Sequence, residues 1–139
     1  MEKINKLKKL FKNYNIDGYI VPKNDEFFSE YIPENKDRLK FISNFSGSYG
    51  FALILKNKNY LFVDGRYTLQ AKMQSKKMFD IVTLPKKFPH HVLKKERLNI
   101  GFDPKLHTQK TLKIFFNKTN CRLVSVYQNL IDKLNIQKA

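Results

Sequence analysis

The segment from Tyr60 to Ala71 constrains the fold of this chain more than any other. An apolar run, Tyr60-Leu-Phe-Val63, stops at Asp64-Gly65, and apolar residues then recur at helical spacing. This pattern predicts a buried strand, a sharp turn and a helix capped by Asp64. In α/β proteins, ligands bind just beyond the carboxyl ends of strands. We therefore expect a functional site, if the chain has one, to lie near this junction.

Arg66 falls in the first turn of the expected helix, with Tyr67 beside it. The helix dipole disfavours a cation at this position by roughly a few tenths of a kcal/mol. The presence of Arg66 at this position therefore implies an anion nearby, supplied by the protein or by a partner. Two interpretations stay open: Arg66 pairs with a carboxylate that holds the turn, or the turn is a contact surface for a partner domain or an anionic ligand.

The same patterns assign the remaining elements. Helices are predicted over residues 2–14 and 65–76 and from Thr108 or Thr111 onward, with shorter helical turns at 26–31, 38–43 and 130–134. Strands are predicted over residues 17–22, 48–55, 60–63, 79–84, 98–102 and 121–126, the second and third forming a hairpin around an Asn-rich turn. Helices interleaved with five or six strands indicate an α/β domain built on a single mixed sheet.

Composition excludes several classes of protein. The 139 residues are 42% hydrophobic and 14% aromatic, which is typical of one folded domain and not of a disordered chain. No apolar run reaches the roughly 18 to 20 residues that span a bilayer, so we expect no membrane partner. The single cysteine, Cys121, cannot form an internal disulfide and suits a cytoplasmic location. We expect its thiol to be buried on a strand.

The net charge of +15 has two possible sources. Only four of the 27 basic residues are Arg, and the lysines are spread along the chain with many Asn and Ile. An AT-rich genome would produce this composition through codon bias. The alternative is a basic module that binds a polyanion such as nucleic acid. In either case we expect binding to nucleic acid to be weak, nonspecific and sensitive to salt.

No arrangement of residues predicts catalysis. The three histidines, His90, His91 and His107, lack neighbouring ligands at a metal-binding spacing. The Gly-rich segment 45–50 precedes a strand, whereas phosphate-binding loops precede a helix. No nucleophile elbow occurs either. We therefore predict no catalytic residue, metal ligand or cofactor on this chain.

Several segments, in their order along the chain, resemble the N-terminal domain of Xaa-Pro aminopeptidase (aminopeptidase P). They are Asp17–Pro22, Ser29–Ile32, Arg38–Gly50, Val63–Ala71, Ile100–Pro104 and Asn129–Asp132. The resemblance implies a creatinase/prolidase N-terminal domain with a ribonuclease-H-like mixed sheet and flanking helices. It sets the domain at residues 1–134, followed by a tail at 135–139.

In that family the enzyme removes an N-terminal residue that precedes proline. It uses two divalent metals, usually manganese, held in a separate C-terminal "pita-bread" domain. The resemblance implies that this catalytic domain is absent here, since none of its ligands matches a position of this sequence. We therefore expect a non-catalytic, inactive domain, as a fragment or a split or truncated product.

The family's first domain helps to build the oligomer and borders a neighbouring active site. By this resemblance Asp64, Arg66 and Tyr67 become candidates for interface or substrate-end contacts, and Phe45 and Ser46 join them. The expected partners are a second copy of the chain or a catalytic metallopeptidase domain. The sequence leaves open whether the loop containing Phe45 and the turn containing Arg66 lie at the same end of the sheet.

Overall fold

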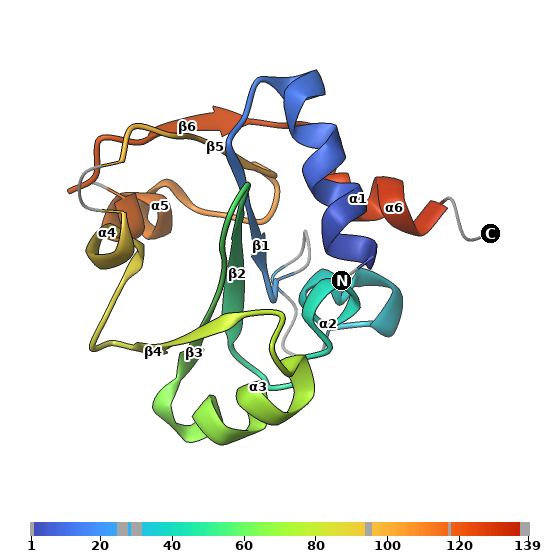
Figure 1. The fold of residues 1–139 in the computed structure, drawn as a ribbon, viewed down its shortest axis with the longest axis vertical. Helices are drawn as coiled ribbons and strands as arrows, with labels where there is room; N and C mark the ends of the chain where they lie inside the picture. The colour runs from blue at the N-terminus through green and yellow to red at the C-terminus, as the bar shows by residue number, and fades with distance from the viewer. Residues whose placement is uncertain (1, 25–27, 29–31, 94–95, 117, 137–139) are drawn as a thin grey trace.

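A six-stranded sheet in the order β4-β3-β2-β1-β5-β6 runs through the molecule (Figure 1). The structure, a computed structural model, describes residues 2–24, 28, 32–93, 96–116 and 118–136. The strands are β1 Gly18–Pro22, β2 Gly50–Leu55, β3 Asn59–Asp64, β4 Asp80–Leu84, β5 Asn99–Phe102 and β6 Arg122–Ser125. The helices are α1 Glu2–Leu10, α2 Arg38–Ser43, α3 Thr68–Ser75, α4 Pro89–Val92, α5 Gln109–Phe116 and α6 Leu130–Ile136, with 3-10 turns η1 Phe11–Tyr14, η2 Glu34–Lys36 and η3 Gly65–Tyr67.

Strand β2 is antiparallel to both of its neighbours, β1 and β3. The other paired strands, β3 with β4, β1 with β5 and β5 with β6, are parallel. The carboxyl ends of β1, β3, β4, β5 and β6 therefore meet at one edge of the sheet. The beginning of β2 lies at that same edge.

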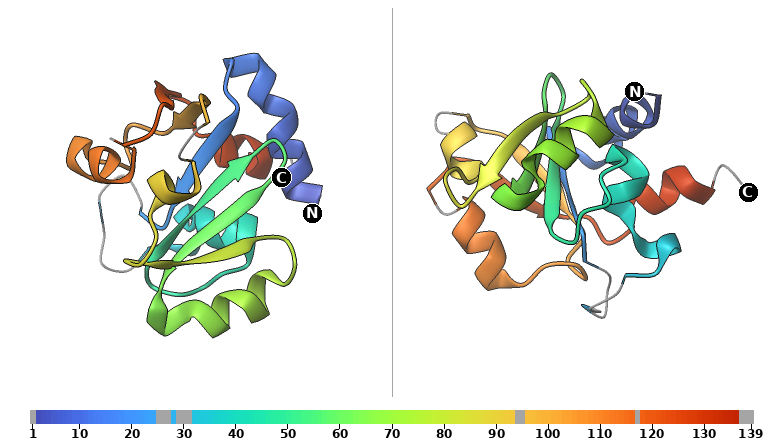
Figure 2. Two further views of the ribbon diagram at one scale, coloured as in Figure 1. Left: turned by 60° about the vertical axis from the view of Figure 1, so that its left-hand side comes forward. Right: turned by 90° about the horizontal axis from the view of Figure 1, so that it is seen from below.

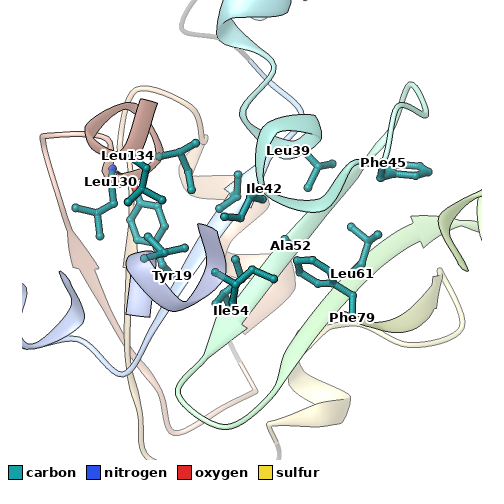
Figure 3. Close-up of a cluster of buried hydrophobic side chains, with 14 of the residues drawn as sticks. Tyr19, Leu39, Ile42, Phe45, Ala52, Ile54, Leu61, Phe79, Leu130 and Leu134 are labelled. Atoms are coloured by element: carbon teal, nitrogen blue, oxygen red, sulfur yellow. Dashed lines mark hydrogen bonds between the residues drawn. The ribbon is translucent and has the colours of Figure 1, made fainter. Parts of the chain in front are cut away.

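Helices lie on both faces of the sheet (Figure 2), and each face carries a separate apolar core. On one face, residues from α1, α2, α3 and α6 pack together with Tyr19, Ile54 and Leu61 of the sheet (Figure 3). On the other face, α5 contributes Phe115, which stacks on Phe51 of β2 with ring centroids 4.5 Å apart. Because both faces are covered, β1 and β2 are buried along their whole length.

Two asparagines end helical segments by adopting positive φ. Asn15 follows η1 with φ 56°, and Asn44 follows α2 with φ 66°. In each case the backbone N–H of the asparagine bonds back to a carbonyl of the preceding turn, which satisfies an otherwise unpaired group. Asn44 thereby directs the chain out of α2 and into the loop that leads to β2.

The predicted fold class is confirmed, and so are the hairpin and the helix at 38–43. The predicted helical turn at 26–31 lies outside the described residues except for residue 28. His90 and His91 lie on the short helix α4, which periodicity could not detect in one turn. The expectation of a Cys121 thiol buried on a strand is wrong, because β6 begins only at Arg122 and Cys121 is half-buried. Helix α6 continues to Ile136, two residues past the expected boundary at 134.

An ion pair joins α2 to α6 at the edge of the first core. Arg38 Nε and Nη2 donate to the two carboxylate oxygens of Asp132 at 2.8 and 3.0 Å. The Arg38 side chain is 7% exposed and the Asp132 side chain 44%. Bidentate geometry and burial make this pair stronger than an ordinary surface contact.

We predict that Asp132→Asn lowers the free energy of unfolding by roughly 1 to 3 kcal/mol, because it removes the charge facing a buried guanidinium. Urea unfolding monitored by circular dichroism measures this. The matched control is Glu2→Gln, which breaks the exposed pair with Lys6 and should cost under about 0.5 kcal/mol. Equal losses in the two variants would contradict the assignment.

Candidate functional site

The loop 44–50 and the turn 64–67 lie together at the carboxyl edge of the sheet. Gly50 pairs with Val63 in the antiparallel register, so the chain enters β2 where it leaves β3. The loop containing Phe45 and the turn containing Arg66 therefore lie at the same end of the sheet, which the sequence left open. The five predicted site residues are therefore brought to one end of the molecule.

Phe45 and Tyr67 form the centre of this site. The Phe45 ring is fully buried, and the Tyr67 ring meets it edge-on with centroids 6.0 Å apart. The Tyr67 hydroxyl and Ser48 Oγ share a hydrogen bond 2.5 Å long. A side chain at Gly47 would overlap the Phe45 ring, so glycine there allows the loop to fold over the aromatic ring. The Phe45–Tyr67 ring contact and the Tyr67–Ser48 hydrogen bond thus hold the loop 44–50 against the turn 64–67.

Ser46 is held by two glutamines of α3. Its backbone N–H donates to Gln74 Oε1 at 2.9 Å, and its Oγ accepts from Gln74 Nε2 at 2.8 Å and Gln70 Nε2 at 3.2 Å. Sequence reasoning missed both glutamines. Their i,i+4 spacing, which places them on one helix face, was the available signal.

Asp64 and Arg66 form an exposed local pair. Asp64 Oδ1 accepts from the backbone N–H of Arg66 at 2.9 Å and from its Nε at 3.1 Å, which confirms Asp64 as a cap. The backbone hydrogen bond, followed by the guanidinium, lowers the pKa of Asp64 from its usual value. The Arg66 side chain is nevertheless 75% exposed and Asp64 41%, so the carboxylate that holds the turn is not a buried one.

The outer face of α3 continues this exposed surface. Leu69 and Met73 are 71% and 70% exposed, and they follow Arg66 at helical spacing. Sequence periodicity paired Leu69 with Met73 but could not show which way they face. Ala71 and Ser75 fill the buried side of the helix instead. We call Arg66, Leu69 and Met73 the α3 ridge.

His107 lies at the same edge, beside a small cavity of about 50 Å³ that is also lined by Lys23, Ser48 and Tyr49. The His107 Nε2 atom is buried and has no hydrogen-bond partner within the described residues. Burial lowers the pKa of His107 to about 4. The His107 residue is half-buried, and its ring meets Phe102 at the end of β5 edge-on, with ring centroids 6.0 Å apart.

Within the described part of the chain, no group of three or more His, Cys, Asp and Glu residues is placed to hold a metal ion. None of the described helices is long and apolar enough to cross a membrane.

Comparisons with known proteins define the family. The Creatinase/Prolidase N-terminal domain family matches residues 3–135. A probable Xaa-Pro aminopeptidase P of Aspergillus flavus is 35% identical over 140 residues, covering 94% of this chain and 21% of the relative. One of Coprinopsis cinerea is 48% identical over 68 residues, covering 49% and 11%. This chain belongs to the creatinase/prolidase N-terminal domain family.

Two solved structures have the same fold as this chain. The X-prolyl aminopeptidase of Caenorhabditis elegans, described as a cytosolic enzyme with a di-nuclear active site, superposes with a TM-score of 0.82 at 30% identity, covering 95% of this chain and 25% of that one. The N-terminal domain of the peptidase PepQ from Mycobacterium tuberculosis has the same fold, with a TM-score of 0.72 at 20% identity and coverage of 96% and 98%. The chain spans less than a quarter of the length of the curated relatives it matches.

We predict that Arg66→Ala leaves the melting temperature unchanged within error, because both members of its ion pair are exposed and solvent screens them. Phe45→Ala is the contrasting variant at the same site. It empties a fully buried position and should cost about 3 to 5 kcal/mol. Thermal melts followed by circular dichroism compare the two, and a large loss in the Arg66 variant would contradict the geometry.

We predict that His107 makes stability depend on pH. Its folded pKa of about 4 lies below the unfolded value. Its contribution is therefore fully present above pH ~6.5 and is lost as the pH falls toward the folded value. Across that window the free energy of unfolding should fall by roughly 1 kcal/mol per pH unit through this group. Urea titrations of wild type and His107→Gln isolate the effect by subtraction, and parallel curves would refute it.

Proposed function

We propose that this chain is a non-catalytic domain of an aminopeptidase P-like metallopeptidase. Its role is to assemble with a catalytic metallopeptidase domain, or with further copies, and to shape access of the peptide substrate. The location we propose is cytoplasmic, in keeping with the description of the Caenorhabditis elegans enzyme as cytosolic.

The observation that carries the proposal is the α3 ridge. Two large apolar side chains stand about 70% exposed beside an oriented guanidinium, on a helix that Gln70 and Gln74 anchor to the loop 44–50. Exposed apolar groups at a rigid position are typical of an interface, and Arg is enriched at interfaces. The occupant we favour is the catalytic domain, because the matched segment makes up only 21% and 25% of the length of two relatives.

The contacts that anchor α3 to the loop 44–50 lower the entropic cost of binding a partner. The glutamine contacts to Ser46 and the Tyr67–Ser48 bond hold α3 against the loop before any partner arrives. A preordered surface loses less conformational entropy on binding. The chain's part in substrate access would follow from where this edge is held relative to the catalytic domain.

We predict that the chain alone, supplied with manganese, does not hydrolyse an Xaa-Pro peptide. Mixed with the Aspergillus flavus relative produced without its N-terminal segment, it should bind that polypeptide and raise its turnover. Size-exclusion chromatography and release of the N-terminal residue measure the two effects. Turnover by the chain alone that a chelator abolishes would refute the proposal.

The ridge is tested within the same assay. Leu69→Glu with Met73→Glu places two charges in the proposed interface and should abolish binding. Ile114→Glu, which alters a 47% exposed apolar residue on α5, is the matched control and should bind as wild type does. Equal effects of the two changes would exclude α3 as the docking surface.

A further inference from the structure

The edge of the sheet opposite the candidate site carries a cluster of lysines. At this edge the turn between β2 and β3 approaches the end of α1 and the following η1. A surface hollow of about 550 Å³ lies there, lined by Lys8, Lys9, Phe11, Lys12 and Lys56. Four of these five described lining residues are cations, and none carries a carboxylate. We call this feature the lysine hollow.

Contacts fix the shape of the hollow. Lys8 Nζ donates to the carbonyl of Lys56 at 3.2 Å, which ties α1 to the hairpin turn. Lys56 Nζ in turn lies 3.3 Å from Asp17 Oδ1. Lys9 and Lys12 are exposed and line the same space. Lys8 and Lys56 thus make contacts that shape the hollow, and Lys9 and Lys12 are exposed to solvent.

The neighbouring acids mark where the positive surface ends. Asp17 and Glu96 line an adjacent hollow that shares Lys56, and Glu2 lies 3.5 Å from Lys6 one turn earlier on α1. Partial burial lowers the pKa of Lys8, so an anion nearby would offset a desolvation cost that the folded chain already carries.

We propose that the lysine hollow binds the phosphodiester backbone of a nucleic acid without reading its bases. Lysine ammonium groups bind phosphate as point charges, and their concentration on one concave surface raises the local density of anions. The site offers no means of base recognition among its lining residues. It contains no Arg for bidentate contacts, and Phe11 is only 1% exposed, which leaves no ring for base stacking.

This inference is independent of the proposed function, because it uses the opposite edge of the sheet and no residue of the α3 ridge. It also differs from attraction by net charge alone. A net charge of +15 acts wherever lysines lie, whereas the hollow concentrates binding at one place. Variants with equal net charge therefore distinguish binding at the hollow from attraction by net charge.

The test compares two double variants with the same change in charge. Lys9→Glu with Lys12→Glu reverses the exposed cations of the hollow and keeps Lys8 and Lys56, which make structural contacts. Lys72→Glu with Lys77→Glu reverses two exposed lysines in and after α3. Each pair lowers the net charge from +15 to +11, since every Lys→Glu change replaces one positive charge by one negative charge. Far-ultraviolet circular dichroism verifies that both variants fold.

Binding of a fluorescent single-stranded oligothymidine is followed by anisotropy between about 50 and 200 mM salt. The hollow variant should lose at least about ten-fold in affinity at the low-salt end, and the slope of log affinity against log salt should shrink by roughly 1.4, since each phosphate contact contributes about 0.7 for a single strand. The α3 variant should keep the wild-type slope and lose less than about three-fold.

Equal losses in the two variants would show that net charge alone causes binding, and would overturn the proposal. Absence of wild-type binding at about 50 mM salt would overturn it as well. A further arm uses vesicles of phosphatidylserine and phosphatidylcholine. If wild type binds these more tightly than the oligonucleotide and only the hollow variant loses that binding, the hollow belongs to a membrane surface and the assignment to nucleic acid fails.

Discussion

The antiparallel pairing of β2 with β3 determines how the two ends of this molecule differ. Its register places Gly50 opposite Val63, so the loop entering β2 and the turn leaving β3 share one edge. The same hairpin directs its own turn, residues 56–58, to the opposite edge, against α1. A slip of one residue would turn each strand's side chains to the other face. The two cores oppose such a slip through their specific packing, because it would take Phe51 away from Phe115 in one core and Ala52 out of the other.

The two edges differ in chemistry as a consequence. At the carboxyl edge, polar groups are largely satisfied by one another: Ser46 by two glutamines, Tyr67 by Ser48, and Arg66 by Asp64. Leu69 and Met73 remain exposed there without such partners, beside the exposed Arg66–Asp64 pair. At the opposite edge, lysines face solvent around a hollow and only Lys56 has a nearby carboxylate among the lining residues. The carboxyl edge is suited to an interface that excludes water, and the edge with the lysine hollow is suited to a hydrated anion.

Much of this could be predicted from the sequence, because the strands are continuous apolar runs and the turn chemistry is local. Asp64 as a cap and the hairpin around residues 56–59 required no long-range information. Other features depend on contacts between distant segments. The Arg38–Asp132 pair joins residues 94 positions apart, and the glutamines that hold Ser46 lie 24 and 28 positions from it. Periodicity also could not reveal that Leu69 and Met73 face outward, since Ala71 and Ser75 fill the buried side.

The exposure of Leu69 and Met73 leaves a driving force for association within the fold. Burying each side chain at an interface would contribute about 1.5 to 3 kcal/mol from the apolar area removed from water. Association also loses translational and rotational freedom, a cost of roughly 4 to 15 kcal/mol. Two side chains cannot offset such a cost alone, so the α3 ridge would need a wider contact around it. Arg66 is suited to extend that contact, because Asp64 already orients its guanidinium and its exposed side can still meet a carboxylate of the partner.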